Sequence, residues 1–286
     1  MHRKAGSAAL IAATVLALAA CSSDDPGASP SAAAGEFAEG STMAALADAG
    51  TITIGTKFDQ PLFGLKAPSG DPEGFDVEIG TMIAAELGIA PESIEWVETV
   101  SANREAYIMD GTVDIVVATY TINDERKESV SFAGPYYNAG QSLMVLSDNS
   151  DIMGPDDLAG KNVCSVEGST PAANIEENYP DATLKLFEAY TDCLEPLRNG
   201  QVDVVTTDNV ILAGYVAESE DEFKIVGDQF TEEPYGIGLA KDDTDFRMWI
   251  NDVLEASFED GRWLDAWNGT AGTVLPEPTA PTVDRY

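Results

Sequence analysis

Two segments of this chain, residues 110–119 and 199–208, follow the same local plan. Each passes from a turn with a glycine through Val-Asp into an apolar run, which ends in Thr119 in the first segment and in Asp208 in the second. A helix that ends at glycine and leads into a buried strand is a unit of α/β sheets, whose ligands bind at the carboxyl ends of the strands. The repeat predicts two similar α/β lobes that present Thr119 and Asp208 to a common cleft. A chance match of two short patterns is the alternative.

The stretch between residues 51 and 268 alternates short apolar runs with helical periodicity, as α/β proteins do. Residues 51–55 predict a strand that ends in glycine, and the apolar run 115–118 predicts a strand buried on both faces. Apolar side chains at helical spacing predict helices over 75–87 and 246–258, with a last short helix after Gly261. The 286 residues are enough for two domains.

The N-terminus has the build of a signal peptide over residues 1–20. A basic start at residues 2–4 precedes an apolar run that is too short to span a bilayer comfortably. The ending Leu-Ala-Ala-Cys at residues 18–21 resembles the lipobox of bacterial lipoproteins, in which the cysteine carries the lipid (palmitate) after cleavage. We therefore predict a lipid anchor on Cys21 and a location on the outer face of the cell membrane. A signal peptide with an incidental cysteine is the alternative.

Two further segments are too polar or too rich in proline to build a core. Residues 21–42 consist mainly of Ser, Ala, Gly, Pro and acidic residues and predict a flexible tether. Residues 271–286 contain Pro276, Pro278 and Pro281 and predict an extended, irregular tail.

The charge and the single histidine exclude several classes of function. The formal net charge is −35, which repels phosphate backbones and anionic membrane surfaces, so we expect no nucleic-acid partner. The only histidine, His2, lies in the predicted signal peptide. The mature chain then has no histidine for a Ser-His-Asp or Cys-His mechanism or for a metal site. We expect no catalytic residues, no metal and no cofactor.

Cys164 and Cys193 remain as an even pair in an exported chain, which predicts a disulfide. In the chain-entropy model such a bond contributes about 3–4 kcal/mol. Two buried free thiols are the alternative, and a metal site at these cysteines lacks further ligands.

Several short motifs occur together along the chain. They are Gly-Phe-Asp-Val-Glu-Ile at 74–79, Thr-Tyr-Thr-Ile-Asn-Asp-Glu-Arg at 119–126, Phe-Ala-Gly-Pro-Tyr-Tyr at 132–137, Gly-Ser-Thr at 168–170 and Thr-Asp at 207–208. In this order, behind a lipobox, they resemble the polar amino-acid-binding proteins of ABC importers (solute-binding family 3) over about residues 45–270.

The resemblance implies a two-lobed periplasmic-binding-protein-like fold of type II. Each lobe is an α/β sheet with flanking helices, and the ligand cleft lies between the lobes. We expect residues 43–140 with 236–270 in lobe 1 and 141–235 in lobe 2, with crossovers near 140–145 and 233–237.

The same resemblance assigns residues to the α-groups of an amino acid, and burying either group unpaired costs several kcal/mol. Arg126 carries the planar fork that suits the α-carboxylate, and Asp208 can take the α-ammonium. The Thr119 carbonyl and the Thr121 hydroxyl complete these shells. Ser169 and Thr170 would close on the carboxylate from the other lobe. The alternatives are a solvated Arg126 beside acidic neighbours and a helix N-cap role for Asp208.

Two cations in so acidic a chain indicate an acidic side chain on the ligand. Lys57 and Arg104, with Ser101 as a helper, resemble the residues that hold the side-chain carboxylate in the glutamate/aspartate binders of this family. Tyr190 stands where that subgroup also reaches the ligand. The alternative is that the two cations merely offset local acids.

Two places depart from the family pattern. Asp-Gln-Pro at 59–61 stands where glutamine and basic-residue binders offer an aromatic ring, which weakens those assignments. Glu167 would repel an acidic ligand unless its side chain turns to solvent.

We therefore predict a monomeric binding protein, not an enzyme, that captures L-glutamate, or aspartate, glutamine or asparagine, and delivers it to an ABC permease. A ligand sensor that reports to a receptor is an alternative, because transport and sensing use the same closed form. A dehydratase on the same fold is a further alternative and would need Glu167 or Asp208 as its general acid.

Overall fold

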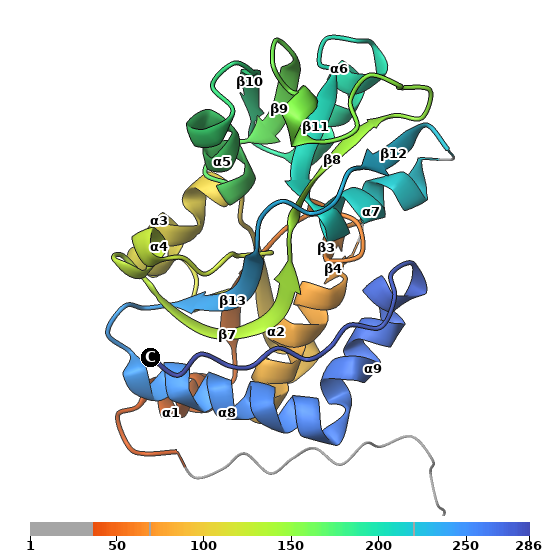
Figure 1. The fold of residues 1–286 in the computed structure, drawn as a ribbon. Coiled ribbons are helices and arrows are strands. Elements are labelled where there is room, and N and C mark those ends of the chain that lie inside the picture. The colour runs from red at the N-terminus through yellow and green to blue at the C-terminus, as the bar shows by residue number, and fades with distance from the viewer. Residues whose placement is uncertain (1–36, 69, 220) are drawn as a thin grey trace, which may run out of the picture. The chain divides into compact units, whose positions relative to one another are not determined.

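Two five-stranded sheets carry the fold of the described part of the chain (Figure 1). The structure is a computed structural model and describes residues 37–286 except 69 and 220. The predicted signal peptide, the predicted lipid site Cys21 and residues 22–36 lie outside the described residues.

The sheet of the first lobe has the order β5-β1-β6-β13-β7, with β1 parallel to β5 and β6, and β13 antiparallel to β6 and β7. Its strands are β1 (Ile52–Thr56), β5 (Ile94–Glu98), β6 (Ile115–Val116), β7 (Ser131–Ala139) and β13 (Glu233–Leu239). A small antiparallel sheet follows β1 and consists of β2 (Asp59–Gln60), β3 (Gly64–Lys66) and β4 (Pro72–Glu73).

The sheet of the second lobe has the order β10-β9-β11-β8-β12. Its central strand pairs are parallel (β10 with β9, β9 with β11), whereas β8 runs antiparallel to both β11 and β12. The strands are β8 (Gln141–Leu146), β9 (Asn162–Val166), β10 (Thr183–Phe187), β11 (Val204–Asp208) and β12 (Phe223–Val226).

Helices connect and cover the strands of both sheets (Figure 1). Those associated with the first sheet are α1 (Thr42–Ala49), α2 (Phe75–Glu86), α3 (Arg104–Met109), α4 (Asp124–Lys127), α8 (Thr244–Asp260) and α9 (Arg262–Gly269). Those of the second are α5 (Thr170–Asn178), α6 (Leu194–Arg198) and α7 (Asn209–Glu218). Short 3₁₀ turns are η1 (Pro91–Ser93), η2 (Ser101–Asn103), η3 (Pro155–Asp157), η4 (Tyr190–Cys193) and η5 (Ala271–Thr273).

The ends of the helices follow local capping chemistry. The hydroxyl of Ser169 accepts a hydrogen bond from the backbone N–H of Ala172 and so caps α5. Helix α8 is capped in the same way by Asp243 and ends at Gly261, whose φ of 91° is in the left-handed region that glycine adopts readily. No helix in the described ranges is long and apolar enough to cross a bilayer.

The predicted repeat is confirmed by the two sheets. Strands β6 and β11 each lie beside the first parallel strand of their sheet, and each follows a helix whose end is marked by a left-handed glycine, Gly111 or Gly200. The predicted strand at 115–118 is shorter than expected, because the ladder stops at Val116 although residues 115–118 are all buried. The chain then turns at Thr119, whose φ is 43°.

The predicted helices over 75–87 and 246–258 and the last short helix after Gly261 are confirmed as α2, α8 and α9. The lobe boundaries stay a prediction, although β13 already pairs with β7 from Glu233 onward.

Two segments expected to be loose are packed against the first lobe. The predicted tether lies mostly outside the described residues, but at its end the Phe37 ring packs on Trp249 with centroids 5.8 Å apart, and Thr42 begins α1. The expectation of a free tether is therefore wrong for residues 37–42. The tail is irregular after η5, as predicted, yet Val283 is buried and Asp284 N–H donates to the Gly134 carbonyl.

The predicted disulfide is confirmed, which excludes the alternative of two free thiols. Cys164 lies on β9 and Cys193 at the end of η4, so the bond ties the central sheet of the second lobe to the start of α6.

Reducing this disulfide is expected to lower the free energy of unfolding by about 3–4 kcal/mol, because the opened chain gains conformational freedom when it unfolds. Guanidinium denaturation of the same protein with and without reductant measures the difference and changes no side chain. Equal unfolding midpoints, with both thiols shown to be free in the reduced sample, would contradict this.

Candidate functional site

The residues predicted to bind a ligand converge where the second lobe meets the first. Eight of the ten line one small cavity of about 10 Å³, which is roughly the space of one water. They are Ser101, Arg104, Thr119 and Thr121 of the first lobe and Ser169, Thr170, Tyr190 and Asp208 of the second. The prediction that Thr119 and Asp208 face a common cleft is confirmed, because both line this cavity.

Lys57 and Arg126 lie beside this cavity. Lys57 donates a hydrogen bond to Ser101, which lines it. Arg126 lines a larger outer cavity of about 530 Å³, together with Ser169 and Thr170. Pro171 and Ile211 complete the wall of the small cavity and were missed by sequence reasoning, because apolar residues in a buried run carry no signal of ligand contact.

Arg104 is held at the start of α3 by backbone carbonyls. Its Nε donates to the Ser101 carbonyl at 3.2 Å, and one terminal nitrogen donates to the carbonyls of Ala118 and Thr119 at 3.2 and 3.3 Å. The other terminal nitrogen reaches across to the Gly168 carbonyl of the second lobe at 3.2 Å. The side chain is 2% exposed, so these carbonyls replace water around the charge.

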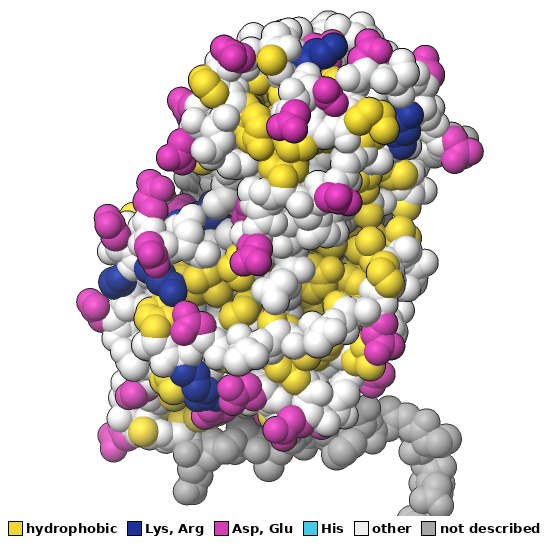
Figure 2. Space-filling view, viewed as in Figure 1, with side chains coloured by type: hydrophobic (Ala, Val, Ile, Leu, Met, Phe, Trp, Pro, Cys, Tyr) yellow, Lys and Arg dark blue, Asp and Glu magenta, His cyan; other side chains and the backbone are white. Residues whose placement is uncertain are grey.

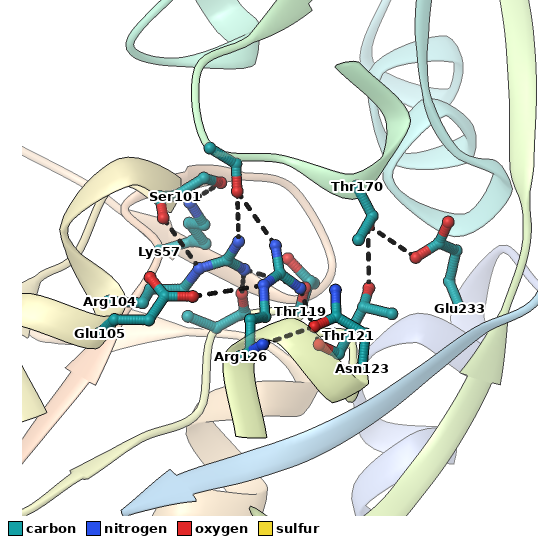
Figure 3. Close-up of polar contacts among 12 residues, drawn as sticks. Lys57, Ser101, Arg104, Glu105, Thr119, Thr121, Asn123, Arg126, Thr170 and Glu233 are labelled. Carbon is teal, nitrogen blue, oxygen red and sulfur yellow. Dashed lines mark hydrogen bonds and ion pairs between the residues drawn. The ribbon is translucent and has the colours of Figure 1, made fainter. Parts of the chain in front are cut away.

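Arg126 reaches the same carbonyl from α4. One terminal nitrogen donates to the Thr121 carbonyl at 2.7 Å and the other to Gly168 O at 3.0 Å, and Nε pairs with Glu105 at 3.3 Å. Figure 3 shows the two guanidinium groups converging on one oxygen. Arg126 is only 8% exposed, so the alternative of a solvated arginine is wrong. Burial and the neighbouring Arg104 lower the pKa of Arg126 to about 10, which leaves it charged at neutral pH.

Lys57 follows β1 and is buried behind Ser101. Its ammonium donates to the Ser101 hydroxyl at 2.9 Å. Burial, and then the positive charge of Arg104, lower the pKa of Lys57 to about 7. Among the described residues, neither Lys57 nor Arg104 takes part in an ion pair within 4.0 Å, so neither offsets a neighbouring acid by direct contact.

Asp208 forms the acidic end of the site. Its Oδ2 accepts a hydrogen bond from the Tyr235 hydroxyl at 2.6 Å, while Oδ1 is buried and has no hydrogen-bond partner among the described residues. Asp208 occupies the N-cap position of α7, as the alternative expected, but its side chain accepts no capping hydrogen bond there, so capping does not use its carboxylate. Burial, and then the charge of Glu233, raise the pKa of Asp208 to about 8.

Glu233 is a second buried acid that sequence reasoning missed. Its carboxylate accepts hydrogen bonds from Thr170 at 2.7 Å and from Thr231 at 2.8 Å. The Thr170 hydroxyl also lies 3.3 Å from the Thr121 hydroxyl of the first lobe and can accept a hydrogen bond from it. In a chain with 50 acidic residues, nothing in the sequence separates Glu233 from its exposed neighbours.

Asp76 was also missed as a site residue, although its motif was recognised. The carboxylate is fully buried in the first turn of α2 and accepts hydrogen bonds from Thr119 N–H and the Tyr136 hydroxyl, both at 2.7 Å. It therefore holds Thr119 in its left-handed conformation, which directs the end of β6 at the cavity. Burial raises the pKa of Asp76 to about 7.

Glu167 is exposed and lines the outer cavity, so it is not among the residues around the small one. Within residues 37–286, leaving aside 69 and 220, no three His, Cys, Asp or Glu side chains are grouped in a way that could hold a metal ion.

Asp76→Ala is expected to lower the free energy of unfolding by about 2–4 kcal/mol, because the Thr119 N–H and the Tyr136 hydroxyl would stay buried without their acceptor. Chemical denaturation measures this, and Glu78→Ala on the exposed side of the same helix is the matched control with little expected change. Equal losses in the two variants would show that Asp76 has no special role.

Comparison with known proteins gives consistent matches along the chain. A sequence model of the bacterial extracellular solute-binding proteins, family 3, matches residues 52–268. The glutamate-binding protein GluB of Corynebacterium efficiens is 41% identical over 260 residues, which cover 86% of this chain and 88% of GluB. The ABC transporter glutamine-binding protein GlnH of Bacillus subtilis is 38% identical over 251 residues, covering 87% and 90%.

Solved structures match with similar breadth. A solute receptor for L-cysteine of Neisseria gonorrhoeae superposes with a TM-score of 0.78 at 30% identity, covering 84% of this chain and 98% of the receptor. An ancestral arginine-binding protein bound to glutamine has a TM-score of 0.73 at 33% identity, covering 77% and 97%.

Proposed function

Because this chain belongs to the bacterial extracellular solute-binding proteins, family 3, we propose that it captures L-glutamate between its lobes and delivers it to an ABC permease. The two-lobed α/β fold of type II periplasmic binding proteins is the fold of its solved relatives and of this chain. The curated relatives are named binding proteins and not enzymes, and this chain is likewise an amino-acid-binding receptor rather than a dehydratase.

The choice of glutamate rests on the buried positive charge of the site. Arg104 and Arg126 converge on one carbonyl oxygen, and the Lys57 ammonium lies behind Ser101. One α-carboxylate needs one such partner, so the remaining cations fit a second carboxylate on the ligand. We assign the α-carboxylate to Arg126 with Ser169 and Thr170, and the side-chain carboxylate to Lys57, Arg104 and Ser101.

The α-ammonium fits the acidic end of the cavity. The free Oδ1 of Asp208 is a buried acceptor, and an ammonium supplies three donors. Thr119, Thr121 and Tyr190 line the same cavity, and we assign the Thr119 carbonyl and the Thr121 hydroxyl to its polar wall.

Capture requires that the lobes separate, because a cavity of about 10 Å³ is too small for an amino acid. Opening would break the contacts of both guanidinium groups with Gly168 and of Thr170 with Thr121. Among the described residues, two connections join the sheets, from β7 to β8 and from β12 to β13, and we propose that they are the hinge (Figure 1). The lobes would then be residues 43–140 with 236–270 and residues 141–235.

A lipid on Cys21 would keep this monomeric receptor at the outer face of the membrane, near its permease.

Glutamine is a second candidate ligand, because the relative GlnH is named a glutamine-binding protein. A glutamine side chain is uncharged, so it would leave the cations near Ser101 without a carboxylate.

Replacing the buried Lys57 by methionine separates these two ligands. Lys57→Met should weaken glutamate binding about tenfold or more, because a charged hydrogen bond is lost, and glutamine binding much less. Lys66→Met, at an exposed lysine on β3, is the matched control and should change neither affinity. Calorimetric titration of the chain from Ser22, which contains all the described residues, measures both affinities. A glutamate affinity that Lys57→Met leaves unchanged would refute the assignment of Lys57.

The pH dependence of binding gives an independent test. Asp208, with a pKa of about 8, must lose its proton to bind an ammonium, so affinity should rise with pH below about 7 for both ligands. Lys57, with a pKa of about 7, must gain a proton to bind a carboxylate. Glutamate affinity should therefore level off between pH 7 and 8 and fall above pH 8, whereas glutamine affinity should not share this fall.

The ratio of the two affinities, titrated from pH 6 to 9, is the quantity to compare, because the α-amino groups of the two ligands titrate alike and largely cancel in it. A constant ratio across this range would contradict the proposed contact between Lys57 and a carboxylate.

A further inference from the structure

A second set of contacts joins the lobes away from the guanidinium groups. The segment of residues 57–61 begins with Lys57 and continues through β2. In this segment the Asp59 carboxylate accepts a hydrogen bond from Tyr190 N–H at 2.9 Å, and the Asp59 carbonyl accepts one from the Tyr215 hydroxyl at 2.8 Å. Tyr190 and Tyr215 belong to η4 and α7 of the second lobe and are 3% and 2% exposed.

A glycine allows α7 to approach this segment closely. A Cβ added to Gly214 would lie 2.6 Å from the Pro61 carbonyl oxygen and 3.1 Å from the Pro61 Cβ. Real Cβ atoms do not come that close to a backbone oxygen, so any larger residue at position 214 would push the two lobes apart. Gly214 lies in the interior of α7, where glycine is intrinsically unfavourable relative to alanine.

We propose that Asp59 is a positioning residue which, with Pro61 and Gly214, forms an interlobe latch that holds Tyr190 at the ligand site and sets how long the ligand stays bound. The inference deepens the proposed function and rests on it. The Asp59 carboxylate acts on the ligand through Tyr190, which lines the cavity, and the same short segment supplies Lys57 to the Ser101 side of the site.

The latch contributes only while the lobes are together. When they part, water can reach the Tyr190 N–H, the Tyr215 hydroxyl and the Asp59 oxygens, and these groups keep hydrogen bonds of similar strength. Removing a latch contact therefore destabilises the closed form relative to the open form and leaves the stability of each separate lobe nearly unchanged. Because the latch forms after the ligand has entered, its loss should raise the dissociation rate much more than it lowers the association rate.

Gly214→Ala tests the latch with two effects of opposite sign. The added methyl group should raise the glutamate Kd about tenfold through a faster dissociation rate, while the melting temperature without ligand stays equal or rises because alanine favours the helix. The matched control is Gly269→Ala in α9, where an added Cβ has no atom within 4 Å, and it should leave Kd unchanged. The proposal is overturned if Gly214→Ala leaves the Kd unchanged, or if it raises the Kd and also lowers the melting temperature.

Variants of the hydrogen-bonding groups test Asp59 itself. Tyr215→Phe and Asp59→Ala should each raise Kd about three- to tenfold, again through dissociation, because each leaves a closed-state group unpaired. Asp59→Asn retains an oxygen acceptor for Tyr190 N–H and should restore most of the affinity. If Asp59→Asn binds as weakly as Asp59→Ala, the hydrogen bond is not the active feature and the proposal fails.

A distance measurement separates failure of the latch from failure of the proposed function. Spin labels on Met109→Cys and Met153→Cys, whose parent side chains are 61% and 59% exposed, report the separation of the two lobes. Gly214→Ala should shift the distribution to longer distances than in wild type or Gly269→Ala, with or without glutamate. Identical distributions overturn the latch. A shift in a protein whose wild type binds no glutamate supports the latch and rejects glutamate as the ligand.

Discussion

The guanidinium groups of Arg104 and Arg126 lie close together and are almost fully buried, which the surrounding backbone must compensate. It does so with backbone carbonyls that follow β6. The carbonyls of Ala118, Thr119 and Thr121 accept hydrogen bonds from the two arginines. The Tyr120 ring lies against both guanidinium groups, with its centroid 4.3 Å from Cζ of Arg104 and 5.0 Å from Cζ of Arg126. These carbonyls are available because the β6 ladder stops at Val116, and the turn that aims them is held by Asp76. The short strand is thus part of the site.

The second lobe reaches this cluster through glycines. A Cβ added to Gly168 would lie 2.7 Å from the Cα of Ala102 in the first lobe, and Gly214 has the same relation to Pro61. Close approach of backbones lets carbonyl and hydroxyl groups pair across the cleft without long side chains that would lose rotamer freedom on closure. Such contacts contribute modest energies, so the two forms of the molecule can remain close in free energy and a small ligand can shift their balance.

The charge of the molecule and the charge of its site have opposite signs. Acidic side chains are spread over the face seen in Figure 2, in keeping with the formal net charge of −35, while three cations gather at the cleft. Salt screens exposed charges beyond about 8 Å at physiological ionic strength, whereas buried charges are screened much less. The binding of an anionic ligand in the cleft therefore depends on the nearby cations more than on the net charge of the chain. Burial, and then the charge of Arg104, lower the pKa of Lys57, so an unpaired Lys57 ammonium is unfavourable there and a ligand carboxylate would stabilise it.

Local signals in the sequence predict the α/β class, the paired lobes and the disulfide, because hydrophobic periodicity, the repeat at 110–119 and 199–208 and an even pair of cysteines can be recognised without the fold. Most of the cavity wall followed from the resemblance of short motifs to solute-binding family 3. Only the tertiary structure decided that Asp76 holds Thr119, that Glu233 joins Asp208 and that Asp59 meets Tyr190, since each pair lies far apart in the chain. It also decided that Phe37 and Val283 are packed although their segments look loose. The physical reason is that a polar group's partner is set by which backbone donors and acceptors the fold leaves unpaired nearby, and this depends on where ladders end and lobes touch.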